Sequence, residues 1–119
     1  MIPVWIAMAG GFGALARFVV DGLVRTQLGR SFPWGTLIIN VSGSLLLGII
    51  AALAWSGHIS GDAALVIGVG FCGGYTTFST ASFETVRLLE ERRIFAAVFQ
   101  TLGNAGFAVL AIAVGLLLF

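Results

Sequence analysis

Charged side chains are scarce in this sequence. Its 119 residues include six Lys or Arg and five Asp or Glu, a charged share of 9%, whereas 59% of the residues are hydrophobic. A soluble domain usually draws about a quarter of its residues from the charged set, so these side chains cannot cover a soluble surface. The mean hydropathy is +1.08, and each spanning helix needs about 20 apolar residues. We therefore predict an integral membrane protein of one domain, residues 1–119, with the lipid bilayer as its surroundings.

Other features are absent as well. All the basic residues are arginines, and their scattered positions do not indicate a nucleic-acid surface. The lone cysteine, Cys72, excludes an intrachain disulfide and a multi-cysteine metal site. The first basic residue is Arg17, so the basic start of a signal peptide is missing and we expect the first span to be retained. The sequence presents no Ser-His-Asp or Cys-His pairing, and His58 lacks a second metal ligand nearby. We do not expect an enzyme.

The apolar stretches predict an all-α fold with four transmembrane helices. The expected spans are Ile2 to Val24, Trp34 to Trp55, a third from about Ala63, and Ile94 to Phe119. Residues 84–93 are expected to form a charged helical extension of the third span. Five arginines (Arg25, Arg30, Arg87, Arg92 and Arg93) fall in the first and third connections, and the other connection and both termini have none. The positive-inside rule then predicts cytoplasmic first and third loops with both termini outside.

Arg17 and Asp21 lie four residues apart and therefore on one face of the first span. One interpretation is an ion pair near the membrane interface, with both side chains reaching toward water. The other takes Arg17 as the positive charge of an aqueous vestibule that attracts anions, because ionisable residues within a membrane commonly mark functional sites. Position alone does not separate these two interpretations.

Carboxamides and hydroxyls at helical spacing indicate a polar track. Thr36, Asn40 and Ser44 form a stripe along the second span, and Gln100 and Asn104 lie one turn apart on the fourth. Carboxamides in lipid are costly unless they are partnered, and they can bind an anion through NH₂ or a cation through the carbonyl. These residues indicate either a polar pathway or interhelical contacts, and they do not show whether a ligand would be an anion or a cation.

The third span carries a glycine- and hydroxyl-rich segment, residues 73–84, where lipid would favour an uninterrupted helix. Adjacent Gly73 and Gly74 are expected to unwind it, because glycine tolerates non-helical backbone. Freed carbonyls around Thr76 would be hard oxygen ligands of the kind that hold Na⁺ in broken-helix transporters. Nearby hydroxyls can donate to an anion, and the ring edge of Phe78 carries positive potential. We predict that this break, near Gly73–Thr80, lines something polar.

Three strings stand in three different spans: GGFGA with Arg17 in residues 10–17, PWGTL with Asn40 and Gly43 in residues 33–43, and GFCGGYTTFST with Glu84 in residues 70–84. Together they resemble the small fluoride channels of the Fluc (CrcB) family, and the likeness covers essentially the whole chain. The resemblance implies a passive channel in the cell membrane that exports fluoride. It also implies an antiparallel dimer with two fluoride pathways and a central structural Na⁺.

Carried over by position, the resemblance assigns the Na⁺ to the backbone carbonyls of Gly73 and Thr76. It assigns the vestibule charge to Arg17. The expected lining of the fluoride pathway consists of Asn40, Phe78, Ser79, Thr80 and Asn104.

Two features depart from the family. A second phenylalanine is usual three residues after Phe78, where this chain has Ala81, and Phe83 lies five residues away on another part of a helix. The strong arginine bias also suits one fixed orientation better than insertion in both. Two assemblies therefore stay open. One is a homodimer of dual topology. The other is a heterodimer with an oppositely oriented homologue, in which one pore is degenerate. One rival hypothesis is a small multidrug-type proton antiporter. Such antiporters have a glutamate in the first span where this chain has Arg17, which argues against proton coupling. The other rival hypothesis is a non-transporting assembly subunit.

Overall fold

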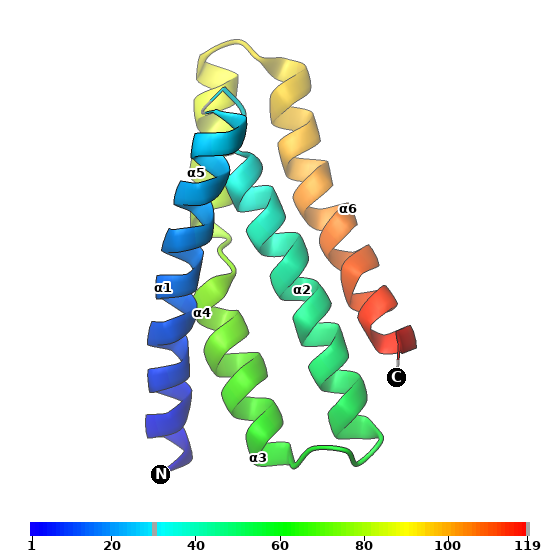
Figure 1. The fold of residues 1–119 in the computed structure, drawn as a ribbon. Helices are drawn as coiled ribbons and strands as arrows, with labels where there is room; N and C mark the ends of the chain where they lie inside the picture. The colour runs from blue at the N-terminus through cyan, green and yellow to red at the C-terminus, as the bar shows by residue number, and fades with distance from the viewer. Residues whose placement is uncertain (30, 119) are drawn as a thin grey trace.

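The computed structural model describes residues 1–29 and 31–118, so Arg30 and Phe119 lie outside the described residues. Within that part the chain is helical, and four helical stretches are long and apolar enough to cross a membrane. The helices stand side by side along one long direction (Figure 1). Their bounds are α1 Ile2–Leu28, α2 Trp34–Trp55, α3 Gly61–Ala64, the π-helix η1 Leu65–Cys72, α4 Gly73–Tyr75, α5 Ser79–Glu90 and α6 Ile94–Leu118. The prediction of an all-α fold with four spans is confirmed.

The first helix is longer than the sequence suggested, because it continues past Val24 to Leu28. It ends at Gly29, whose φ of 79° is one that glycine adopts readily, and the Gly29 N–H donates to the Arg25 carbonyl. The second helix begins and ends where the tryptophans predicted.

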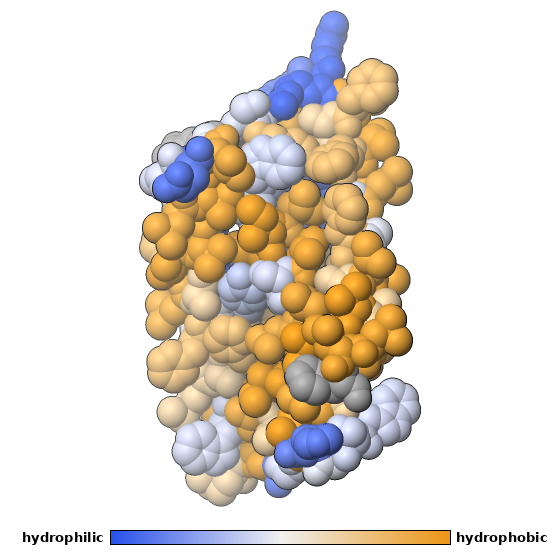
Figure 2. All heavy atoms as spheres, turned by 45° about the vertical axis from the view of Figure 1, so that its right-hand side comes forward, coloured by the Kyte–Doolittle hydropathy of each residue, from blue (hydrophilic) through white to orange (hydrophobic). Residues whose placement is uncertain are grey.

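The outer surface is apolar over most of its height. Figure 2 shows apolar side chains across the middle of one face and hydrophilic side chains gathered toward the two ends. Large hydrophobic residues such as Phe18 (79% exposed) and Phe95 (93% exposed) lie fully on the outside. A soluble protein rarely exposes a continuous apolar surface of this kind. The arrangement is the one expected of helices surrounded by lipid.

Small residues set how closely the helices approach. α2 packs along α6, and α1 packs along η1 and α4. A Cβ atom at Gly48 would collide with the Ile112 backbone on α6, and one at Gly115 would collide with the α2 backbone. Small residues at such crossings are the usual way in which membrane helices come into contact.

The third span is interrupted, but not at the glycine pair. Gly73 and Gly74 are helical within α4, and the chain leaves the helix at Thr76, whose ψ is 161°. A Cβ atom at residue 74 would collide with the backbone carbonyl of Gly10, so this glycine allows α1 to approach closely. The expected break is therefore present between Gly73 and Thr80, whereas the expectation that Gly73 and Gly74 themselves unwind is wrong.

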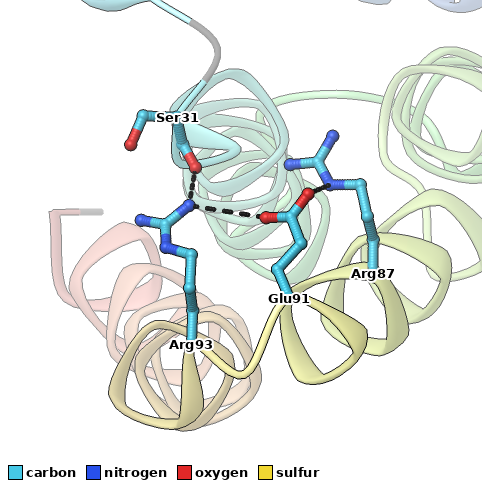
Figure 3. Close-up of polar contacts among 4 residues, drawn as sticks. All are labelled: Ser31, Arg87, Glu91 and Arg93. Atoms are coloured by element: carbon cyan, nitrogen blue, oxygen red, sulfur yellow. Dashed lines mark hydrogen bonds and ion pairs between the residues drawn. The ribbon is translucent and has the colours of Figure 1, made fainter.

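The connection between α1 and α2 and the connection between α5 and α6 lie at the same end of the molecule (Figure 1). Arg93 donates through Nη1 to the backbone carbonyl of Ser31, which joins the start of α6 to the connection after α1 (Figure 3). Glu91 lies between Arg87 and Arg93, with N···O distances of 3.9 Å to each. The start of α1, the end of α6 and the connection between α2 and α3 lie toward the opposite end (Figure 1).

Candidate functional site

A groove of about 700 Å³ opens between α2, the broken third span and α6. Five of the eight residues that the resemblance assigns to the fluoride pathway or the Na⁺ site line it: Asn40, Gly73, Thr76, Phe78 and Asn104. The rest of its wall is apolar or bears hydroxyls, apart from the carboxamide of Gln100, and comprises Gly43, Ser44, Leu47, Gly68, Cys72, Thr77, Ala81, Ser82, Thr85, Val86, Gln100, Thr101, Ala105 and Ala108. The groove brings the polar positions of three separate spans to one place at the depth of the membrane.

Asn40 is the centre of a hydrogen-bond network in this groove. Its Nδ2 donates to the Thr77 carbonyl at 2.9 Å and to Asn104 Oδ1 at 2.7 Å. Its Oδ1 accepts from the Thr77 backbone N–H at 2.9 Å. Asn104 in turn donates through Nδ2 to the Gln100 carbonyl at 2.7 Å. A carboxamide has two N–H donors, so Asn104 keeps one donor for the groove whereas Asn40 uses both.

The break leaves backbone carbonyls without their helical partners. In a continuous helix the Thr77 N–H would donate to Gly73 and the Thr80 N–H to Thr76. Here the first donates to Asn40, and the second donates to Thr77 Oγ1 at 3.2 Å. The carbonyls of Gly73 and Thr76 are thus available as hard oxygen ligands, and this donor set suits Na⁺. Within residues 1–29 and 31–118 no cluster of His, Cys, Asp and Glu offers another metal site.

The segment is further held by α2. The side chain of Thr76 packs directly against Gly43, and a Cβ atom at residue 43 would overlap Thr76 Cγ2. One residue earlier, Ser42 Oγ lies 2.9 Å from the Tyr75 hydroxyl. These contacts place α2 against three successive residues of the third span, 75 to 77.

The remaining predicted residues lie elsewhere. Ser79 and Thr80 are exposed at the start of α5 and lie outside the groove wall, and Arg17 is half-buried on α1, away from it. Phe78 lines the groove with a side chain that is 86% exposed. Asp21 pairs with Arg25 at 2.9 Å, so the interpretation of an Arg17–Asp21 ion pair is wrong.

Ala81 occupies the groove wall at the position of the missing second phenylalanine, and it is 9% exposed. Phe83 lies outside the groove with 70% of its surface exposed. The expectation that Phe83 points elsewhere is confirmed.

Two further polar residues, Glu84 and Gln100, are buried in contact with each other beside the predicted site. Gln100 is fully buried and donates through Nε2 to Glu84 Oε1 at 3.4 Å, and Glu84 is 7% exposed. Gln100 Oε1 has no hydrogen-bond partner among the described residues. Glu84 also lines a smaller, polar pocket of about 170 Å³ with Asp21, Arg25 and Arg87. The Gln100–Glu84 contact therefore stands between the groove and a charged pocket at the arginine-rich end.

Sequence reasoning did not assign Glu84 or Thr77 a role in the site. Glu84 begins the segment that the sequence predicts as a charged helical extension, because its neighbours there are charged. Thr77 was one hydroxyl among several, although a threonine three residues before a backbone N–H at a helix start is a frequent cap. That capping signal could have identified Thr77.

Comparison with known proteins gives consistent matches. Residues 4–116 match a family described as CrcB-like protein, Camphor Resistance (CrcB). The "Fluoride-specific ion channel FluC 1" of Leifsonia xyli is 45% identical over 116 residues, which cover 98% of this chain and 85% of that protein. "Fluoride-specific ion channel FluC 2" of Cutibacterium acnes is 44% identical, covering 99% and 97% of the two chains. "Fluoride-specific ion channel FluC" of Thermus thermophilus is 40% identical, covering 83% and 79%.

Proposed function

This chain belongs to the CrcB family, and we propose that it conducts fluoride passively across the cell membrane as one half of an antiparallel dimer with a structural Na⁺. It is a multi-pass membrane protein and a channel rather than an enzyme. The observation that carries the proposal is the groove at the broken third span. There, amide and hydroxyl groups, an exposed phenylalanine and freed carbonyls meet at membrane depth.

Fluoride is small and strongly hydrated, so a pathway must replace the donors of its water shell. Asn104 has one uncommitted N–H, and Ser79 and Thr80 present hydroxyls at the start of α5. The positive end of that helix favours an anion, and the edge of the Phe78 ring adds positive potential. Asn40 forms the wall beside Asn104, and Arg17 supplies the positive charge of the vestibule.

A second copy completes the site. Phe78, Ser79 and Thr80 are exposed in the single chain, and the groove is open on that side. An oppositely oriented second copy or homologue placed there would cover these side chains and enclose the pathway. The carbonyls of Gly73 and Thr76 from each chain would hold the Na⁺, whose charge would offset the carbonyl dipoles that the break exposes.

Two alternatives remain distinct. A heterodimer with a separately encoded homologue is favoured by the five arginines that the sequence gathers in residues 25–30 and 87–93, and by Ala81 in the groove wall. Small multidrug-type antiporters resemble one another in a membrane-embedded glutamate in the first span, where this chain has Arg17. The acidic residue of α1, Asp21, is paired with Arg25, and the buried Glu84 contacts Gln100 but does not itself line the groove. Passive conduction therefore fits the site better than antiport.

The test is fluoride efflux from liposomes that contain only this chain, measured with a fluoride electrode in the presence of Na⁺. We expect efflux that follows the electrical potential and does not need a pH gradient. Flux that requires an opposing proton gradient would contradict the channel. Silence from a well-folded sample would show that a partner is needed or that this chain is a non-transporting subunit.

A further inference from the structure

Two capping contacts hold the break in the third span, and they come from side chains rather than from the helix itself. Asn40 Oδ1 accepts the Thr77 N–H at 2.9 Å, and Thr77 Oγ1 accepts the Thr80 N–H at 3.2 Å. A continuous helix would send these two N–H groups to the carbonyls of Gly73 and Thr76. Each cap therefore removes the partner of one carbonyl.

The Asn40 carboxamide has no donor left over in this arrangement. Both hydrogens of Nδ2 are used, one on the Thr77 carbonyl and one on Asn104 Oδ1. Together with the bond from the Thr77 N–H, the carboxamide satisfies both backbone groups of Thr77, much as a neighbouring strand would. Backbone groups at membrane depth need such partners, because lipid supplies none.

We propose that Asn40 is a positioning residue that pins the break, and that Asn40 and the Thr77 hydroxyl together release the Gly73 and Thr76 carbonyls for cation binding. The pinning rests on the hydrogen bonds alone, whereas the cation half rests on the proposed function. The competing role for Asn40 is direct donation to fluoride, which would require it to give up a bond to Thr77 or to Asn104.

Amide hydrogen exchange of the detergent-solubilised protein, resolved at Thr77 and Thr80, tests the pinning without any transport. Asn40→Leu removes the acceptor for Thr77, and Thr77→Val removes the acceptor for Thr80 with little change of shape. We expect exchange to quicken at least tenfold at Thr77 in the first variant and at Thr80 in the second.

Ser44→Ala is the matched control. Ser44 lies one turn further along α2 and lines the same groove without taking part in either cap. We expect it to leave exchange at both threonines unchanged. If Asn40→Leu and Thr77→Val also leave exchange within twofold of the wild type while fluoride efflux falls, these side chains act directly on the ion and the proposal is wrong.

The cation half is tested by Na⁺-dependent thermal stability of the same samples, because a ligand that binds the folded state raises its stability. We expect Asn40→Leu to need at least tenfold more Na⁺ than the wild type for half of the stabilisation. Equal Na⁺ requirements alongside altered exchange would overturn the release of carbonyls and leave the pinning supported. A wild type without any Na⁺ response would overturn the proposed cation itself, and the exchange data would still decide the role of Asn40.

Discussion

At the scale of single residues, side chains of the same type differ in the contacts that they make in the groove. Asn40 and Asn104 are the same residue type on neighbouring helices, yet Asn104 alone of the two keeps a free N–H. Two phenylalanines of the third span differ in the same way, because Phe78 lines the groove and Phe83 faces outward. Residue type therefore does not assign a role here, whereas contacts do.

The phenylalanine pair gives a matched test at this scale. Phe78→Leu removes the aromatic ring that lines the groove, and we expect fluoride efflux from liposomes to fall about tenfold or more, corresponding to roughly 1.4 kcal/mol or more of barrier. Phe83→Leu makes the same chemical change on the outer face, and efflux should stay within about twofold of the wild type. Equal losses in the two variants would show that the groove is not the fluoride pathway.

At the scale of elements, sequence patterns predicted the helices well because lipid leaves few alternatives. Hydropathy and terminal tryptophans set the bounds of α2, and glycine with hydroxyls indicated a break in the third span. The position of the break within that segment could not be read locally. It depends on Asn40, which lies 37 residues before Thr77 in the chain and takes its N–H.

Glycine was also ambiguous at this scale. Gly74 has the freedom to unwind a helix, but the structure uses its small size for the contact between α1 and α4. Helical spacing was ambiguous for Asp21 as well. It allows Asp21 to pair with Arg17, four residues before it, or with Arg25, four residues after it, and the structure has the pair with Arg25. The role of Gly74 depends on the neighbouring helix, whereas the partner of Asp21 depends on which of two arginines of its own helix it reaches.

The α1–α4 contact yields a prediction on stability. Gly74→Ala places a Cβ against the Gly10 carbonyl, and overpacking of this kind costs about 1–3 kcal/mol. We expect a lower midpoint of thermal unfolding in detergent. Gly11→Ala is the control, since an added Cβ there meets no atom within 4 Å and alanine is a better helix former. A midpoint for Gly74→Ala equal to that of the control would contradict the close approach of these helices.

At the scale of the whole molecule, the connection after α1 and the connection before α6 lie at one end (Figure 1), and Arg93 joins them through Ser31 (Figure 3). In the sequence, five arginines fall in or beside these two connections. Basic residues near the ends of spans favour the cytoplasmic side. A chain with this bias is expected to insert in one orientation in the cell, with both termini outside. Reconstitution from detergent bypasses this insertion bias, so antiparallel pairs of this chain can still form in liposomes.

Reporters fused to the carboxy terminus test the orientation. One reporter should be active only inside the cell and the other only outside. We expect signal from the outside reporter alone, and substitution of Arg92 and Arg93 by glutamine should introduce some inside signal. Comparable signals from both reporters on the unsubstituted chain would exclude a fixed orientation and favour a dual-topology homodimer.

The central claim is that one broken span serves two ions, an anion along its groove and a cation on its carbonyls. The most direct measurement is the Na⁺ dependence of fluoride efflux from liposomes that contain this chain alone. The account predicts that purification and reconstitution with N-methylglucamine in place of Na⁺ lowers the rate at least tenfold, and that restoring Na⁺ recovers it. Fluoride efflux that is equally fast with and without Na⁺ would contradict the claim.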